Sequence, residues 1–264
     1  MKQSNLLSLV VTLFILLALS TPGSALQGAG EAKPARTGAA SPYRVGERLT
    51  YNVSFAHFAS AAHVELFVAR RGTFFGREGF ELRAHVETLG EVGAALYALN
   101  NEYISYVDPA SGVPFRTEQM PREHARDAAM PPNFKRSALT SGSPVEVINA
   151  GAYGMYDLLS ALYRARMLPL AQGSVQRLSI SSGAEQYDAE LKVTGREFIK
   201  TNVGSYNAIV TQVRTRGGSR AGDLRDMRIY FSDDALRLPV LLTLRHTIGE
   251  IRIELASSEV VPEP

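Results

Sequence analysis

The sequence predicts a mainly β protein, with an antiparallel curved sheet, open barrel or sandwich of about a dozen strands packed on one amphipathic helix. Three observations support this fold class. Short segments with an apolar side chain at every second position recur along the chain, which is typical of strands buried on one face. Turn-forming residues such as Gly, Pro and Asp separate these segments. Only one stretch after the N-terminal segment shows the apolar repeat of a helix.

The first half of the chain contains the clearest alternation. Five strands are expected there, at residues 47–55, 62–70, 80–87, 102–107 and 113–120. Residues 71–76 contain two glycines and predict a turn. Asp108-Pro109-Ala110-Ser111-Gly112 has the composition of a hairpin loop. Residues 121–144 break the alternation with Pro131-Pro132 and mixed charges, so we expect a long mobile loop there.

Residues 153–167 predict the single amphipathic helix, around which the sheet is expected to curl. An apolar stripe follows the spacing i, i+3, i+4, i+7 and i+8 and contains Met155, Leu158, Leu159, Leu162 and Tyr163. The other side is polar and carries Asp157, Ser160, Arg164 and Arg166. Pro169 ends the helix because it disfavours the helical conformation of Leu168. We expect this helix to be a core element.

Strands resume after the helix, at residues 175–181, 187–193, 197–200, 206–214, 227–231, 240–246 and 251–255. Residues 216–223 predict a loop that contains Gly and Arg, and residues 247–250 a tight link. The sequence shows neither an internal repeat nor a clear domain boundary. We therefore expect a single β-rich domain at residues 43–258, followed by a tail at residues 259–264.

The N-terminus has the three parts of a secretory signal peptide. Lys2 supplies the positive charge, residues 6–19 are almost continuously apolar, and Gly23 and Ala25 are small residues that suit cleavage after Ala25. We expect a signal peptide at residues 1–25 and a flexible linker at residues 26–42. The alternative is an uncleaved membrane anchor. With cleavage, the mature chain has no transmembrane segment and is exported to the periplasm of a Gram-negative type bacterium.

Composition excludes several classes of function. The formal net charge is only +2, which argues against nucleic acid as a partner. The chain has no cysteine, so disulfides, thiolate metal sites and cysteine nucleophiles are absent. No motif of a known hydrolase, nucleotide-binding loop or zinc site occurs, and none of the five histidines has metal-ligand spacing. We therefore expect no metal and no cofactor.

The most distinctive polar pattern lies between two predicted strands near the C-terminus. Ser232, Asp233 and Asp234 precede Arg237 there, and adjacent carboxylates beside an arginine can hold a cation or a polar ligand. The alternative is a turn, because Ser and Asp side chains at a strand end accept hydrogen bonds from backbone N–H groups. We expect the turn, with Arg237 paired to one of the acids, and take these four residues as the candidate binding residues.

Three segments resemble a family of exported bacterial proteins, domain of unknown function 3108. Tyr43-Arg44-Val45-Gly46-Glu47-Arg48-Leu49-Thr50-Tyr51-Asn52-Val53 is similar to the first strand of that family, V-G-E-x-L-x-Y. Tyr156-Asp157-Leu158-Leu159-Ser160-Ala161-Leu162-Tyr163 resembles its helix. Phe231-Ser232-Asp233-Asp234, with Arg237, Pro239 and Val240, resembles its C-terminal signature. One departure is Tyr230-Phe231, where members often have Trp. The resemblance implies export and a β-rich domain, and it supplies no catalytic residue.

Three functions fit the sequence. The first is a non-enzymatic binding or envelope-maintenance protein, because a curved sheet closed by a helix can enclose a groove for a lipid or other apolar ligand. The second is a structural partner of an envelope protein in an outer-membrane assembly, to which it would present a sheet edge. The third is a hydrolase that uses carboxylates. The missing catalytic motifs favour the first two.

Overall fold

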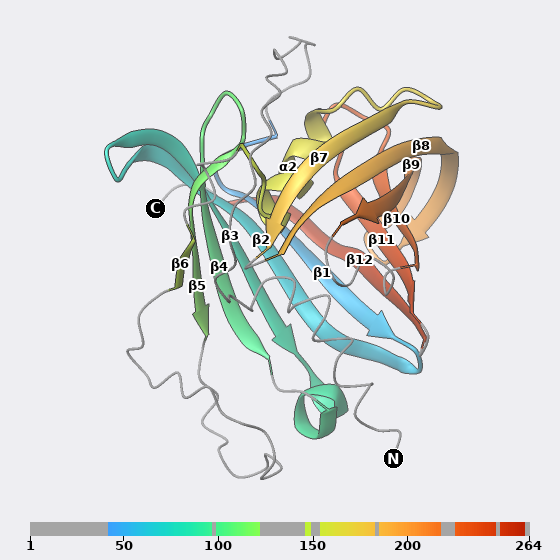
Figure 1. Cartoon of the computed structure of the whole chain (residues 1–264). Helices are drawn as coiled ribbons and strands as arrows, with labels where there is room; N and C mark the ends of the chain where they lie inside the picture. Colours follow the sequence, from blue (N-terminus) through green and yellow to red (C-terminus); the bar gives the residue numbers. More distant parts are fainter. Residues whose placement is uncertain are drawn as a thin grey trace.

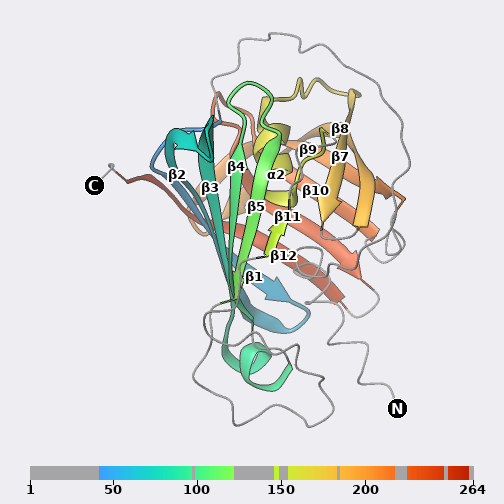
Figure 2. The same ribbon diagram turned by 60° about the vertical axis from the view of Figure 1, so that its left-hand side comes forward.

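The computed structural model describes residues 42–96, 99–121, 146–148, 154–182, 185–217, 225–246 and 249–261. Within these ranges, twelve strands form one antiparallel sheet in the order β6-β5-β4-β3-β2-β1-β12-β11-β10-β9-β8-β7. The strands are β1 Glu47–Phe55, β2 Phe58–Phe74, β3 Arg77–Thr88, β4 Asn100–Val107, β5 Pro114–Pro121, β6 Glu146–Ile148, β7 Val175–Ser182, β8 Glu185–Thr201, β9 Gly204–Arg216, β10 Arg225–Ser232, β11 Pro239–His246 and β12 Gly249–Val260. The sheet curls around helix α2, Leu158–Met167 (Figures 1 and 2).

The sheet consists of two halves joined by the first and last strands. β1 pairs with β12 from Glu47 opposite Val260 to Phe55 opposite Ile251, so β12 extends two residues beyond residue 258. β6 and β7 are the outer strands and are not paired with each other. The predicted mainly β fold around a helix is therefore confirmed, as an open, barrel-like sheet and not a sandwich.

Two predicted interruptions are wrong because the strands continue through them. Residues 71–74 belong to β2, where Gly72 lies opposite Gly79 of β3, and the turn contains only Phe75 and Gly76. Both turn residues have positive φ angles, 52° and 77°, as a two-residue hairpin loop requires. β8 joins two predicted strands through an irregularity between Val193 and Gly195, which shifts the register without ending the pairing.

Helix α2 starts later than predicted. Asp157 is its N-cap and Tyr156 forms an isolated bridge with Ile180, so residues 154–156 of the predicted helix lie outside it. Leu168 is extended, with φ −71° and ψ 150°, which confirms the predicted end before Pro169. A second helical segment, the π-helix η1 at Val92–Leu96, was not predicted.

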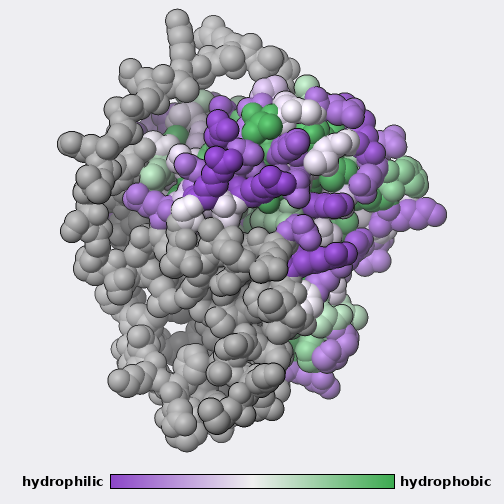
Figure 3. Space-filling model, turned by 45° about the vertical axis from the view of Figure 1, so that its right-hand side comes forward, coloured by the Kyte–Doolittle hydropathy of each residue, from purple (hydrophilic) through white to green (hydrophobic). Residues whose placement is uncertain are grey.

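The polar side of α2 is not a solvent-exposed face. Asp157, Ser160 and Arg166 are all buried, because the sheet contacts the helix on more than its apolar side. Two main apolar clusters flank the helix. The first contains residues of β1–β4 and β9–β12, and the second contains residues of β7–β10. The outer surface seen in Figure 3 is largely hydrophilic over the described residues.

Several predictions concern residues outside the described ranges. These are the signal peptide at residues 1–25, nearly all of the linker, residues 122–144 of the predicted loop, residues 218–223 of the next predicted loop and residues 247–248 of the predicted link. Pro121, the first residue of that predicted loop, ends β5. Among the described helices, none is long and apolar enough to cross a membrane.

Candidate apolar binding site

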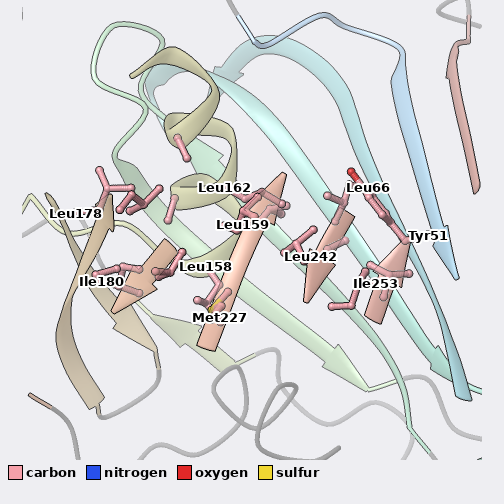
Figure 4. Close-up of a pocket in the computed structure, with 18 of the residues that line it drawn as sticks. Tyr51, Leu66, Leu158, Leu159, Leu162, Leu178, Ile180, Met227, Leu242 and Ile253 are labelled. Carbon is pink, nitrogen blue, oxygen red and sulfur yellow. The ribbon is translucent and has the colours of Figure 1, made fainter. Parts of the chain in front are cut away.

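A cavity of about 220 Å³ lies between α2 and the concave face of the sheet (Figure 4). Its twenty lining residues come from α2 and ten strands: Tyr51, Val64, Leu66, Ala84, Val86, Tyr103, Leu158, Leu159, Ala161, Leu162, Ala165, Leu178, Ile180, Ala189, Leu191, Val213, Met227, Ile229, Leu242 and Ile253. None of them is charged, and only the two tyrosines carry a polar side-chain atom. The cavity therefore suits an apolar molecule.

Strand alternation explains how the sequence builds this lining. Residues two apart on a strand face the same side, so β2 contributes Val64 and Leu66, and β7 contributes Leu178 and Ile180. On α2, residues four apart lie on one face, which brings Ala161 and Ala165 to the cavity. Four alanines stand among the larger lining residues, Ala84, Ala161, Ala165 and Ala189. Their small side chains leave space that leucine would fill.

Seven apolar lining residues remain partly exposed although they lie inside the curve of the sheet. They are Val64, Leu158, Leu162, Val213, Met227, Leu242 and Ile253. In an ordinary core such side chains are buried by their neighbours. Covering this surface with a ligand would be favourable by about 25 cal/mol per Å² of apolar area.

The N-terminus of α2 connects the two sides of the open sheet. The Asp157 carboxylate accepts hydrogen bonds from Ser105 Oγ of β4 at 2.5 Å and from Thr117 Oγ1 of β5 at 2.9 Å. The preceding residue, Tyr156, is hydrogen-bonded through its backbone to Ser179 and Ser181 of β7. These contacts hold the helix in place between the two outer parts of the sheet. Because α2 forms one wall of the cavity, they also fix the position of that wall.

The C-terminal end of α2 is fixed by a buried ion pair. Arg166 donates to the two carboxylate oxygens of Glu47 at 2.5 and 3.0 Å, and it also donates to the Leu236 carbonyl at 3.1 Å. Burial alone would lower the pKa of Arg166, but the hydrogen bonds and charge of Glu47 outweigh burial and raise it. The guanidinium therefore stays charged inside the protein.

The structure places the four candidate residues from the sequence outside the cavity. Ser232 Oγ donates to Asp234 Oδ1 at 2.9 Å and accepts from the Leu238 N–H at 2.8 Å. Asp234 Oδ1 also accepts from the N–H groups of Leu236 at 2.9 Å and Arg237 at 3.0 Å. Every one of these contacts is a turn contact.

Asp233 and Arg237 point to other elements. Asp233 pairs with Arg196 of β8 at 2.5 Å. Arg237 Nη1 donates to the carbonyl of Leu168, the C-cap residue of α2. The expected pairing of Arg237 with an adjacent acid is therefore replaced by a contact that supports the helix end. Among the described residues, no group of three or more His, Asp or Glu side chains could hold a metal ion.

The sequence patterns did not identify the cavity residues as a binding site. The apolar stripe of the helix was assigned to the core, and four of its members, Leu158, Leu159, Leu162 and Tyr163, do pack in the apolar clusters. The first three also line the cavity. The only signal in the sequence was the alternation of apolar residues, which does not distinguish a filled interior from a hollow one.

The chain was compared with curated proteins, with solved structures and with protein families. No curated protein matches the chain. Similar solved structures include a β-barrel-like protein of domain of unknown function 1849 from Brucella abortus, with 9% identity, 83% of this chain and 98% of that chain covered, and a TM-score of 0.48. A protein with a YmcC-like fold from Bacteroides fragilis also has 9% identity, with coverages of 82% and 96% and a TM-score of 0.38.

The family comparison covers most of the chain. The model of the protein family of unknown function DUF3108 matches residues 50–256, which include the helix and the Ser232-Asp233-Asp234 segment. The match begins inside β1, after the Gly46-Glu47 part of the first resembling segment. Because the match spans well over half of the sequence, the chain belongs to the DUF3108 family.

Proposed function

We propose that this protein is an exported, periplasmic binding or envelope-maintenance protein that holds a lipid chain or another apolar ligand in the cavity under α2. The observation that carries the proposal is the uncharged, almost wholly apolar lining, with seven apolar side chains left partly exposed. Export is supported by the signal-peptide pattern of residues 1–25.

The size of the cavity fits a slender ligand. An apolar cavity of about 150 Å³ stays dry and accommodates benzene, whereas pockets for drug-sized ligands are about 300–1,000 Å³. A cavity of about 220 Å³ lies between these values and suits part of an alkyl chain. Each methylene group moved from water into it contributes about 0.8 kcal/mol to binding.

The contacts of the described residues favour this function over the two alternatives. A partner in an outer-membrane assembly would need a free strand edge. β6 has only three residues, and part of the outer edge of β7 is already bonded to Tyr156. A carboxylate hydrolase would need two facing acids, but Asp233 pairs with Arg196 and Asp234 caps a turn.

Native mass spectrometry of the protein purified from the periplasm tests the proposal. The wild type is expected to carry an additional apolar mass. Ala189→Leu puts three more carbon atoms into the cavity and should reduce or abolish that mass while the melting temperature stays equal or rises, because the added side chain occupies existing space. The matched control is Ala59→Leu, at an exposed position of β2, and it should keep the mass. A wild type that binds neither a co-purifying molecule nor added medium-chain lipids would contradict the proposal.

A further inference from the structure

The hairpin formed by β2 and β3 extends past the strands on either side of it. The residue of β2 nearest the turn that pairs with β1 is Phe67, and the residue of β3 nearest the turn that pairs with β4 is Phe80. Residues 69–79, here called the hairpin tip, therefore lie beyond the paired parts of both neighbouring strands (Figure 1). A projecting hairpin of this kind can reach a surface that the rest of the sheet does not touch.

Phe75, the first of the two turn residues, is unusual for a hairpin in two ways. Its φ of 52° lies in the left-handed region, where a bulky residue is an outlier and where such turns usually have Asn. Its side chain is 60% exposed, although the ring meets the edge of Tyr106 with the centroids 5.1 Å apart. Backbone strain concentrates at functional sites. A phenylalanine that is both strained and exposed therefore points to a function at the hairpin tip.

The hairpin tip is positively charged. It contains Arg70, Arg71 and Arg77 and a single acid, Glu78, so its formal net charge is +2. All three arginines are exposed. Arg70 pairs with Glu81, but the Glu81 side chain is only 1% exposed, whereas that of Arg70 is 58% exposed. The cations are therefore outermost, and an anion that approaches the tip meets guanidinium groups first.

Cation–π contacts hold these arginines in place. The guanidinium groups of Arg70, Arg71 and Arg77 lie over aromatic rings, at 5.0, 5.6 and 4.6 Å from the ring centroids. Arg116 of β5 lies over the Phe75 ring itself at 4.1 Å. Side chains that are already ordered lose less entropy on binding, and guanidinium groups bind phosphate through paired hydrogen bonds. The tip thus combines an exposed apolar ring with ordered groups that suit phosphate.

We propose that the hairpin tip docks on the surface of an anionic phospholipid bilayer, with the Phe75 ring inserted below the head groups and with Arg70, Arg71 and Arg77 at the lipid phosphates. Aromatic side chains enter the boundary between head groups and acyl chains, while arginines keep their charged ends at its surface. A protein partner would need about 800 Å² of matched surface, whereas the tip offers one exposed large apolar side chain. This inference goes beyond the proposed function and does not depend on the cavity.

The first test measures binding to vesicles by flotation. Protein purified from the periplasm is mixed with vesicles of equal parts phosphatidylglycerol and phosphatidylcholine, or of phosphatidylcholine alone. The wild type should bind the anionic vesicles more tightly, and added salt should weaken this binding by screening the charges. Arg71→Gln and Arg77→Gln should each weaken it about fivefold, the factor for one basic residue at an anionic surface.

Phe75→Asn separates a docking role from a structural one. It should weaken vesicle binding about fivefold to twentyfold, the factor for moving the exposed part of the ring out of water. Its melting temperature should stay equal or rise, because Asn-Gly is the preferred pair for this turn. A purely structural ring predicts the opposite result, a lower melting temperature with unchanged vesicle binding. The matched control is Phe198→Asn, because Phe198 of β8 is 64% exposed, and this variant should bind vesicles like the wild type.

A fluorescence measurement tests the insertion directly. The chain has no tryptophan, so Phe75→Trp introduces a single indole. Its emission should move to shorter wavelengths when anionic vesicles are added, because the ring leaves water, whereas that of Phe198→Trp should not move. Unshifted emission of Phe75→Trp, wild-type vesicle binding by Phe75→Asn, or equal binding to anionic and neutral vesicles would each overturn this inference. Self-association of the wild type that Phe75→Asn abolishes, without binding to vesicles, would replace the bilayer with a second copy of the chain. None of these results changes the mass bound in the cavity, which tests the proposed function separately.

Discussion

The buried ion pair between Glu47 and Arg166 gives the sharpest stability prediction. The two side chains are each 2% exposed and join β1 to the last turn of α2. Arg166→Met keeps an unbranched side chain but removes the cation. Glu47 then becomes a buried charge without its cation, and the Leu236 carbonyl loses two donors. Breaking a buried pair in this way costs about 3–5 kcal/mol of unfolding free energy.

For a domain of this size, each kcal/mol changes the melting temperature by about 2–4 °C. Arg166→Met should therefore lower the melting temperature by about 6–20 °C. Adding Glu47→Met removes the uncompensated charge, and the double variant should recover most of the loss, because apolar replacements of buried pairs are often neutral or stabilising.

Urea denaturation followed by circular dichroism measures these differences. The matched control is Arg177→Met, because Arg177 pairs with Glu190 at 3.3 Å with its own side chain 70% exposed. Exposed pairs contribute about 0–1 kcal/mol, so this variant should resemble the wild type. An Arg166→Met variant within 1 kcal/mol of the control, or a double variant less stable than both single variants, would refute the reasoning.

Three further predictions concern the helix, the turn and the N-terminus. Leu159→Ala should lower the unfolding free energy in urea by about 2–3 kcal/mol, the low end for this substitution, because the removed atoms border an existing cavity; a loss above 4 kcal/mol would indicate a fully packed site. Asp234→Asn should cost under about 1 kcal/mol, since an amide oxygen also accepts the turn N–H groups, and calcium should not raise the melting temperature. A calcium-dependent rise that Asp234→Asn removes would show a charged site instead. N-terminal sequencing of exported protein should begin at Leu26, and a start at Met1 would exclude cleavage.

Much of the fold could be predicted from local patterns. The alternation in residues 47–55 identified β1 with its observed bounds, and the composition of residues 108–112 identified the loop between β4 and β5. Pro169 correctly ended the helix. The prediction of a turn at residues 71–74 was wrong. The pairing of two strands can continue through a glycine, and here the residue opposite is also a glycine. Gly79 lies opposite Gly72, and a Cβ at Gly79 would come within 2.9 Å of Phe115.

The candidate site shows the limit of such patterns more clearly. Ser232, Asp233 and Asp234 were singled out because they are polar and adjacent, and the structure places them in turn contacts outside the cavity. None of the cavity residues was predicted to belong to a site, because each is an apolar residue at a position where the pattern of a strand or helix predicts core. Their shared feature is an unfilled space, which depends on the sizes of side chains from ten strands and one helix.

The sequence by itself determined the β-rich class, the strand faces and the presence of one amphipathic helix, because periodicity and turn chemistry act between residues close in the chain. Only the tertiary structure decided which way the helix polar groups face. Arg166 looked like a surface residue, yet its partner Glu47 lies 119 residues away and reaches it through the pairing of β1 with β12 and the curl of the sheet. The same long-range packing decided that the interior stays open and that Tyr51 keeps its hydroxyl without a partner in the described chain. Packing density and hydrogen-bond satisfaction are properties of residues brought together in space, and no local pattern specifies them.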